Sequence, residues 1–172
     1  MALTFLLGGA RSGKSELAVR TASSWRGPVV FVATGTAVDE EMAERIRRHR
    51  AERPTAWTTV EEPVQLREAS RGVPTEACLL VDCLSLWVAN LLEAGWQDVA
   101  VEEEATAVAL TLASRGALTL VVSNEVGLGV VPGTPLGRRY RDVLGRVNAI
   151  FAEAASEPVL VVAGRKIRLE EP

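Results

Sequence analysis

The chain has 172 residues, of which 48% are hydrophobic and 24% are charged, as is ordinary for a soluble globular protein. This length suits a single domain over residues 1–172, and the formal net charge of −3 argues against a nucleic-acid-binding protein. No apolar run approaches the roughly 18 residues that cross a membrane, and no signal-peptide pattern opens the chain, so we expect a cytoplasmic protein.

The first predicted element is a buried strand over residues 2–7, and a phosphate-binding sequence follows it directly. Residues 8–15 match the pattern G-x-x-x-x-G-K-[ST], and residues 14–25 continue as a predicted helix. Backbone N–H groups of such a loop bind phosphate, Lys14 reaches the β- and γ-phosphates, and the Ser15 hydroxyl binds Mg²⁺. The flanking strand and helix favour this nucleoside triphosphate site over a ligand-free glycine-rich turn. Its predicted nucleotide-binding residues are Gly8, Gly9, Ala10, Arg11, Ser12, Gly13, Lys14 and Ser15.

Beyond this loop, apolar runs typical of strands alternate with helical patterns. The predicted strands cover residues 28–33, 77–83, 117–123 and 158–163, and the predicted helices cover residues 39–52, 84–94, 99–113 and 136–155. Continuous apolar strands separated by helices indicate an α/β fold of the RecA-like P-loop NTPase class, a mostly parallel sheet with helices on both faces. Residues 165–169 are expected to fold back as an antiparallel edge strand, with Gly164 in the turn.

The only histidine, His49, lies in the predicted helix over residues 39–52, within a run of arginines. At helical spacing Arg45, His49 and Arg53 share one face, beside an apolar stripe of Met42 and Ile46. A lone histidine among arginines is usually solvated. In a chain that binds polyphosphate, however, arginines suit phosphate oxygens, and nearby cations favour the neutral, nucleophilic imidazole. Both interpretations stay open at this point.

Three further segments carry candidate polar groups. Asp82 ends an apolar strand, where P-loop enzymes hold Mg²⁺, although it is also suited to capping the next helix. Residues 123–129 follow the fourth predicted strand and form either part of the site or a plain surface turn; they lack the Asn-Lys-x-Asp signature of switch GTPases. The third segment is a helix whose arginines contact an anionic substrate, a neighbouring subunit or solvent, namely Arg138, Arg139, Arg141 and Arg146.

The two cysteines, Cys78 and Cys83, lie on one predicted strand, where their odd spacing sends them to opposite faces about 16 Å apart. We therefore expect buried, reduced thiols instead of a disulfide. No metal-binding cluster is visible in the sequence, so the expected metal is Mg²⁺ brought by the nucleotide. Trp57 and Trp87 suit core packing better than contact with a flat ligand.

Together these motifs resemble one family over nearly the whole chain, the bifunctional adenosylcobinamide kinase/adenosylcobinamide-phosphate guanylyltransferases of cobalamin biosynthesis. The phosphate loop alone is common to many NTPases. The segment around His49, joined to the Trp-x-Thr-x-Glu stretch from Trp57 and to Asn-Glu-Val-Gly from Asn124, is far more specific. The matching segments are residues 8–15, 39–42, 45–46, 49–50, 53–54, 57–63, 82–87, 90–92, 124–127, 131–132, 141–142 and 145–148.

The resemblance implies two reactions, a kinase step and a nucleotidyl transfer. ATP or GTP phosphorylates adenosylcobinamide, and GMP then passes from GTP, through a guanylyl-histidine at the position of His49, to give adenosylcobinamide-GDP. It also implies Mg²⁺, catalytic roles for His49 and Lys14, and a homotrimer. The further nucleotide contacts that it implies are Thr34, Gly35, Thr36, Arg50, Ala51, Glu52, Arg53, Glu61 and Asp82. Residues 164–169 are more basic than the family's usual ending.

Two rival functions stay open from the sequence. The nearest is a P-loop kinase for another small metabolite, with His49 an idle surface residue. The other is a regulatory nucleotide-binding module, which would need switch segments and a guanine-reading loop, and the sequence shows no sign of either. For this protein we expect neither a nucleic-acid partner nor a membrane span.

Overall fold

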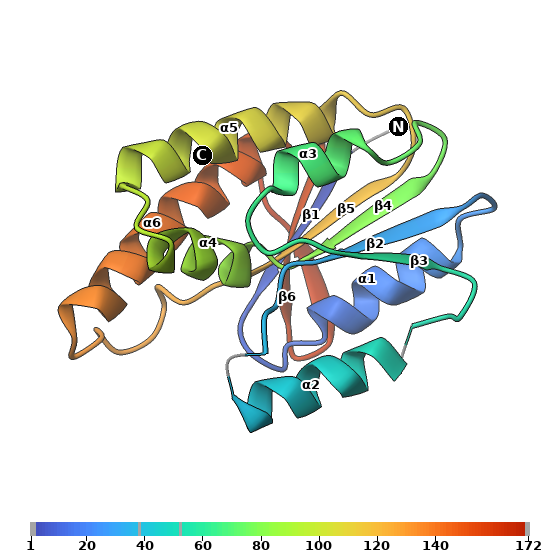
Figure 1. Cartoon of the computed structure of the whole chain (residues 1–172). Coiled ribbons are helices and arrows are strands. Elements are labelled where there is room, and N and C mark those ends of the chain that lie inside the picture. Colours follow the sequence, from blue (N-terminus) through green and yellow to red (C-terminus); the bar gives the residue numbers. More distant parts are fainter. Residues whose placement is uncertain (1–2, 38, 52, 171–172) are drawn as a thin grey trace.

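The computed structural model describes residues 3–37, 39–51 and 53–170, and a seven-stranded sheet forms its centre (Figure 1). The strand order is β3-β2-β4-β5-β1-β6-β7, in which β7 runs antiparallel to β6 and the other neighbours pair in parallel. The strands are β1 (Leu3–Gly8), β2 (Val29–Ala33), β3 (Thr58–Glu61), β4 (Cys78–Asp82), β5 (Thr119–Asn124), β6 (Glu157–Val162) and β7 (Arg165–Arg168). The predicted parallel sheet and its antiparallel edge strand are confirmed.

Helices cover both faces of the sheet, and each face has its own buried cluster (Figure 1). On one face Ala18 and Ala22 of α1 pack against β2, β4 and β5, whereas α3 to α6 cover the other face around fully buried Trp87. The helices are α1 (Lys14–Ser23), α2 (Glu40–Ala51), α3 (Leu66–Arg71), α4 (Leu84–Glu93), α5 (Asp98–Ala113) and α6 (Pro135–Ala154). The predicted α/β class with helices on both faces is therefore confirmed.

Two short elements, β3 and α3, were not predicted from the sequence. The strand β3 reads Thr-Thr-Val-Glu at the edge of the sheet, with three of its four residues exposed, so it lacks the apolar run that marks the other strands. The helix α3 has only six residues, two of them buried, which is too short for a helical period to emerge. Both elements are held by neighbours distant in sequence, since β3 pairs with β2, and Arg67 of α3 forms an ion pair with Glu104 of α5 at 3.2 Å.

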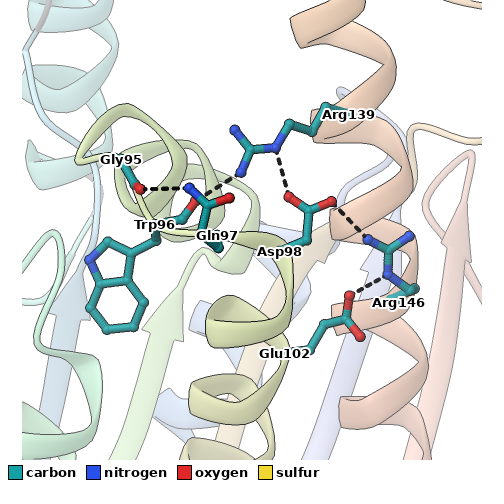
Figure 2. Close-up of polar contacts among 7 residues, drawn as sticks. All are labelled: Gly95, Trp96, Gln97, Asp98, Glu102, Arg139 and Arg146. Carbon is teal, nitrogen blue, oxygen red and sulfur yellow. Dashed lines mark hydrogen bonds and ion pairs between the residues drawn. The ribbon is translucent and has the colours of Figure 1, made fainter.

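Ion pairs join the first turns of α5 to the first half and the middle of α6 (Figure 2). Asp98 accepts from the Nε of Arg139 at 2.6 Å and lies 3.4 Å from an Nη of Arg146, which also contacts Glu102. The second Nη of Arg139 donates to the carbonyl of Trp96. These arginines thus have partners within the chain, although such partly exposed pairs each stabilise the fold by less than about 1 kcal/mol.

The expectation that the cysteines occupy opposite faces of one strand was wrong. The strand β4 ends at Asp82, so Cys83 lies outside the strand alternation, as the residue that precedes α4. Both cysteines belong to the cluster on the α1 face. Both are buried and free, which confirms the expected reduced thiols.

We expect the free energy of unfolding to fall between about pH 9 and pH 11 because of these thiols. Burial raises the pKa of Cys78 and of Cys83 to about 11, against 9.0 for an ordinary thiol. Below about pH 9 both states keep their thiol protons, and above it the unfolded chain loses them first, so stability declines as pH rises toward 11. Urea unfolding over this range measures the decline. In a Cys78→Ala, Cys83→Ala variant the free energy of unfolding should fall less steeply with pH. A slope equal to that of the unmodified protein would show that the two thiols are not the cause of the decline.

Candidate functional site

The phosphate loop wraps tightly between β1 and α1. Gly13 has a left-handed backbone, with φ of 95°, at the position that caps α1. Gly8 has no room for a side chain, because a Cβ there would lie 2.4 Å from the carbonyl oxygen of Val161. Lys14 is only 7% exposed, and its Nζ donates to the carbonyl of Gly9 at 3.0 Å. The lysine therefore lies across the loop, as a phosphate-binding lysine should.

Replacing Gly8 with alanine should destabilise the fold, whereas the same change at Gly9 should not. The added Cβ of Gly8→Ala meets backbone at 2.4 Å, which cannot move cheaply, while a Cβ at Gly9 meets nothing within 4 Å. We expect a loss of roughly 3 kcal/mol for Gly8→Ala and less than about 1 kcal/mol for Gly9→Ala. Urea unfolding of the two variants measures the difference in the free energy of unfolding. Equal losses in both variants would show that the steric clash at Gly8 is not the cause.

The turn between β6 and β7 supports the loop from the other side. It has positive φ at Ala163 and Gly164, as expected for a tight hairpin turn at Gly164, and the Gly164 N–H donates to the carbonyl of Ser12 at 2.9 Å. The Ser12 hydroxyl is buried and has no hydrogen-bond partner among the described residues. A buried hydroxyl without a partner in the loop fits a bound phosphate group.

A cavity lies beside the phosphate loop at the carboxyl ends of the parallel strands. It is lined by Lys14, Ser15, Ala33, Gly35, Ile46, His49, Arg53, Glu61, Asp82, Cys83, Leu86 and Asn124. A second hollow, which extends toward Phe31 and Val19, shares Ser15, His49, Arg53 and Asp82 with the first. The loop, α2 and the end of β4 thus meet in one hollowed region, in the place where open α/β sheets bind ligands.

His49 belongs to the last turn of α2 and is half-buried in the wall of this cavity. Ile46, one turn earlier, lines the same cavity. The neighbouring arginines turn to other partners, since Arg47 binds Glu44 and Arg50 binds Glu61. The histidine therefore lies beside the phosphate loop and not on a fully solvated face.

Arg53 reaches the cavity from the turn that follows α2. The helix ends at Ala51, so Arg53 does not continue the helical face of His49 as expected, and its guanidinium carbon lies 3.5 Å from the centre of the Phe31 ring. Burial lowers the pKa of Arg53, an effect that Asp82 opposes and Arg50 reinforces. Its Nε is buried without a hydrogen-bond partner in the described part of the chain. A desolvated guanidinium with an unused donor suits a phosphate oxygen.

Thr34 and Asn90 hold the strand ends behind the cavity. The fully buried Thr34 hydroxyl accepts from the Cys83 N–H at 2.9 Å and donates to the Cys83 carbonyl at 2.7 Å. The Asn90 side chain donates to the carbonyls of Thr34 and Pro63 at 2.8 and 3.0 Å. These bonds fix the end of β2 against the residue after β4, and so position Asp82 in the cavity wall.

The family of the chain follows from a match over almost its whole length. A family model described as cobinamide kinase / cobinamide phosphate guanyltransferase matches residues 4–169. The chain belongs to this family. It is 43% identical over 166 residues to the bifunctional adenosylcobalamin biosynthesis protein CobP of Pseudomonas aeruginosa, with 96% of this chain and 95% of the relative covered. The corresponding protein CobU of Escherichia coli is 36% identical, with 98% and 99% covered.

Solved structures of distant sequence share the fold of this cobinamide kinase family member. A protein of Pyrococcus horikoshii OT3 superposes with a TM-score of 0.59 at 11% identity, over 97% of this chain and 85% of that one. An ATPase of a type III secretion system gives a TM-score of 0.53 at 10% identity, over 92% of this chain and 50% of the ATPase. At such identities the likeness concerns the P-loop fold alone. The enzyme class, cobinamide kinase and cobinamide phosphate guanyltransferase, follows from the family.

The cobinamide kinase fold gathers many, but not all, of the predicted site residues in the cavity. Those in its walls are Lys14, Ser15, Gly35, His49, Arg53, Glu61 and Asp82. Thr34 is buried behind it, Ala10, Arg11, Thr36, Arg50 and Ala51 are exposed outside its lining, and Glu52 lies outside the described residues, as do the side chains of Met42 and Arg45. Asn90 and Leu86 had been noted only as parts of segments that match the family, and Ala33 only as part of a predicted strand; none had been assigned a role in the site, because they look like ordinary core and helix positions in the sequence.

The donor set of the cavity fits a magnesium ion carried by a nucleotide. Ser15 and Asp82 line both hollows, one supplying a hydroxyl and the other a carboxylate. Among the described residues, no group of three or more His, Cys, Asp or Glu side chains is placed to hold a metal on its own. Mg²⁺ suits this arrangement, because it takes few protein ligands and keeps phosphate and water oxygens.

Among the residues that the structure describes, no helix is both long and apolar enough to span a bilayer.

Proposed function

We propose that the chain phosphorylates adenosylcobinamide with ATP or GTP, and then transfers GMP from GTP to the product through a guanylyl-histidine at His49. The single observation that carries this proposal is that His49 lines the same cavity as Lys14 and Ser15 of the phosphate loop. A triphosphate held by that loop therefore has the chain's only imidazole at its side. The final product is adenosylcobinamide-GDP.

In the first half of the guanylyl transfer, a neutral imidazole nitrogen of His49 attacks the α-phosphorus of GTP. A P–N bond forms, the bond from the α-phosphorus to the oxygen bridging to the β-phosphate breaks, and pyrophosphate leaves. Lys14 and the N–H groups of the phosphate loop stabilise the charge of the leaving pyrophosphate. Arg53, whose buried Nε has no hydrogen-bond partner among the described residues, stabilises the non-bridging oxygens.

In the second half, a phosphate oxygen of adenosylcobinamide phosphate attacks the phosphorus carried by His49. A P–O–P bond forms and the P–N bond breaks, so the imidazole returns to its starting state. The two halves replace one difficult displacement by two that each use a better placed nucleophile.

The kinase step asks less of the protein. The hydroxyl oxygen of the aminopropanol arm bonds to the γ-phosphorus, the bond from that phosphorus to the oxygen bridging to the β-phosphate breaks, ADP or GDP leaves, and the hydroxyl proton passes to water. The loop has mainly to hold the phosphates in line with the hydroxyl. Ser15 and Asp82 would hold Mg²⁺, which supplies further stabilisation of phosphate charge when bound.

The continuous sheet from β3 to β7 supports the proposal of one catalytic domain over residues 1–172. The homotrimer and the cytoplasmic location stay predictions.

The test is incubation of the protein with GTP labelled with ³²P at the α-phosphate. We expect a protein-bound label that is acid-labile and alkali-stable, as a phosphoramidate is, and that moves to the corrinoid when adenosylcobinamide phosphate is added. A protein that phosphorylates adenosylcobinamide but never takes the label would be a kinase without guanylyl transfer by His49. A protein that yields neither corrinoid product would be a nucleotide-binding module.

A further inference from the structure

The segment that joins β5 to α6, together with the first turn of α6, exposes four large apolar side chains close together in sequence. Leu128 is 86% exposed, Val130 is 95% exposed, Val131 is 60% exposed, and Leu136 in the first turn of α6 is 61% exposed. We call these four residues the apolar loop patch. Large apolar side chains concentrated in this way mark a surface that binds something.

Hydrogen bonds at both ends hold this segment in place. At its start the Glu125 N–H donates to the carbonyl of Gly8 at 3.1 Å, and the Gly127 N–H donates to the Glu125 carboxylate. At its end Arg138 donates to the carbonyls of Pro132 and Gly133 at 3.0 and 3.1 Å. The apolar side chains between these anchors are therefore presented outward by an ordered segment.

The patch continues from the cavity that contains His49. Asn124, which ends β5 and lines the cavity, is four residues before Leu128, and the Glu125 N–H binds the phosphate loop itself. Figure 1 shows the segment leaving the carboxyl end of β5 and running below α4 to the start of α6. Leu86 of α4 adds an apolar side chain to the same cavity wall. A ligand whose reacting end lies among the phosphates can thus extend over the patch.

We propose that the apolar loop patch binds the corrin macrocycle of the cobinamide substrate; this inference rests on the proposed function. The hydroxyl that is phosphorylated sits at the end of a short arm, whereas the macrocycle is broad, with apolar ring faces and with methyl groups between its amide side chains. The arm must enter the cavity beside the phosphate loop, and the macrocycle then remains outside, where exposed apolar side chains pack against its ring faces and methyl groups. The other exposed apolar pair near the loop, Val162 and Ile167, lies among the charged side chains of Arg165, Lys166 and Arg168, which suit a corrinoid less well.

A second copy of the chain is the competing occupant of the patch, and the test must separate the two. The variant Leu128→Ser, Val130→Ser removes the two most exposed side chains without touching the core. The matched control is Leu110→Ser. Leu110 is 64% exposed and lies near the carboxyl end of α5, which precedes the first residue of β5 in the chain. Surface changes of this kind leave the fold intact.

Equilibrium dialysis with adenosylcobinamide, followed by its corrin absorbance, measures the binding directly and without catalysis. We expect the dissociation constant to rise roughly tenfold or more in Leu128→Ser, Val130→Ser, and to be unchanged in Leu110→Ser, with GTP binding the same in all three proteins. Unchanged corrinoid binding in the double variant would overturn the proposal. Weaker binding accompanied by a smaller sedimenting species would also overturn it, in favour of a subunit contact. Failure of the α-³²P label on His49 would instead overturn the proposed function, because dialysis does not depend on that step.

Discussion

Replacing His49 with alanine is expected to abolish guanylyl transfer, by roughly 10³-fold or more, while cobinamide phosphorylation continues. The kinase step attacks the γ-phosphorus with the substrate's own hydroxyl and needs no imidazole. The guanylyl transfer, by contrast, loses the nucleophile that would carry GMP. The measurement is product analysis with adenosylcobinamide and GTP, together with the α-³²P label on the protein. We expect the variant to take no label and to accumulate adenosylcobinamide phosphate.

The matched control for this experiment is Arg47→Ala. Arg47 lies on the same helix, α2, but pairs with Glu44 on the exposed side and does not line the cavity. Both reactions should therefore proceed in this variant. If His49→Ala still took the label, another residue would carry GMP. If it lost both reactions equally, the imidazole would serve to hold the nucleotide and not to attack it.

The fold could be predicted from the sequence wherever one local signal sufficed. Buried parallel strands such as β4 carry continuous apolar runs, and the glycines and Lys14 of the phosphate loop follow β1 at the spacing that phosphate binding requires. The short β3 lacked such a run, because an edge strand with exposed threonines is held by its neighbour β2 and not by its own apolar side chains. The end of β4 at Asp82 likewise depends on tertiary contacts, here the buried bonds between Thr34 and Cys83.

The candidate site could be predicted in part for the same reason. Lys14 and Asp82 belong to local motifs that follow strands, so their meeting at one sheet edge follows from the topology. His49 was ambiguous, because helical spacing shows which residues share a face but not what that face meets. Thr34 was expected to contact the nucleotide. In the structure its hydroxyl forms hydrogen bonds with the backbone of Cys83, which is 49 residues away in sequence. The role of Asn90 could not be predicted, because its side chain donates hydrogen bonds to two carbonyls, those of Thr34 and Pro63, which belong to separate loops.

Replacing Lys14 with alanine is expected to abolish both reactions, each by roughly 10²–10³-fold or more. Phosphoryl transfer and guanylyl transfer displace parts of a phosphate chain, and in the proposed mechanism the same loop holds that chain for both. Lys14 is nearly buried and lies across the loop, so its truncation removes the ammonium group from the place where the phosphates bind. Two rates test the steps separately. The first is the rate of formation of adenosylcobinamide phosphate from adenosylcobinamide, and the second is the rate of formation of adenosylcobinamide-GDP when adenosylcobinamide phosphate is added as the substrate.

The chain offers a matched control, because its only other lysine is Lys166 on the exposed strand β7. The variant Lys166→Ala removes the same charge from the protein at a position outside the cavity lining, so both rates should be unchanged. Guanylyl transfer that survived in Lys14→Ala while phosphorylation failed would show that GTP binds a second site for the second reaction. If one phosphate loop serves both steps, the two rates must fall together in Lys14→Ala. In that case His49 must reach a nucleotide that this loop holds.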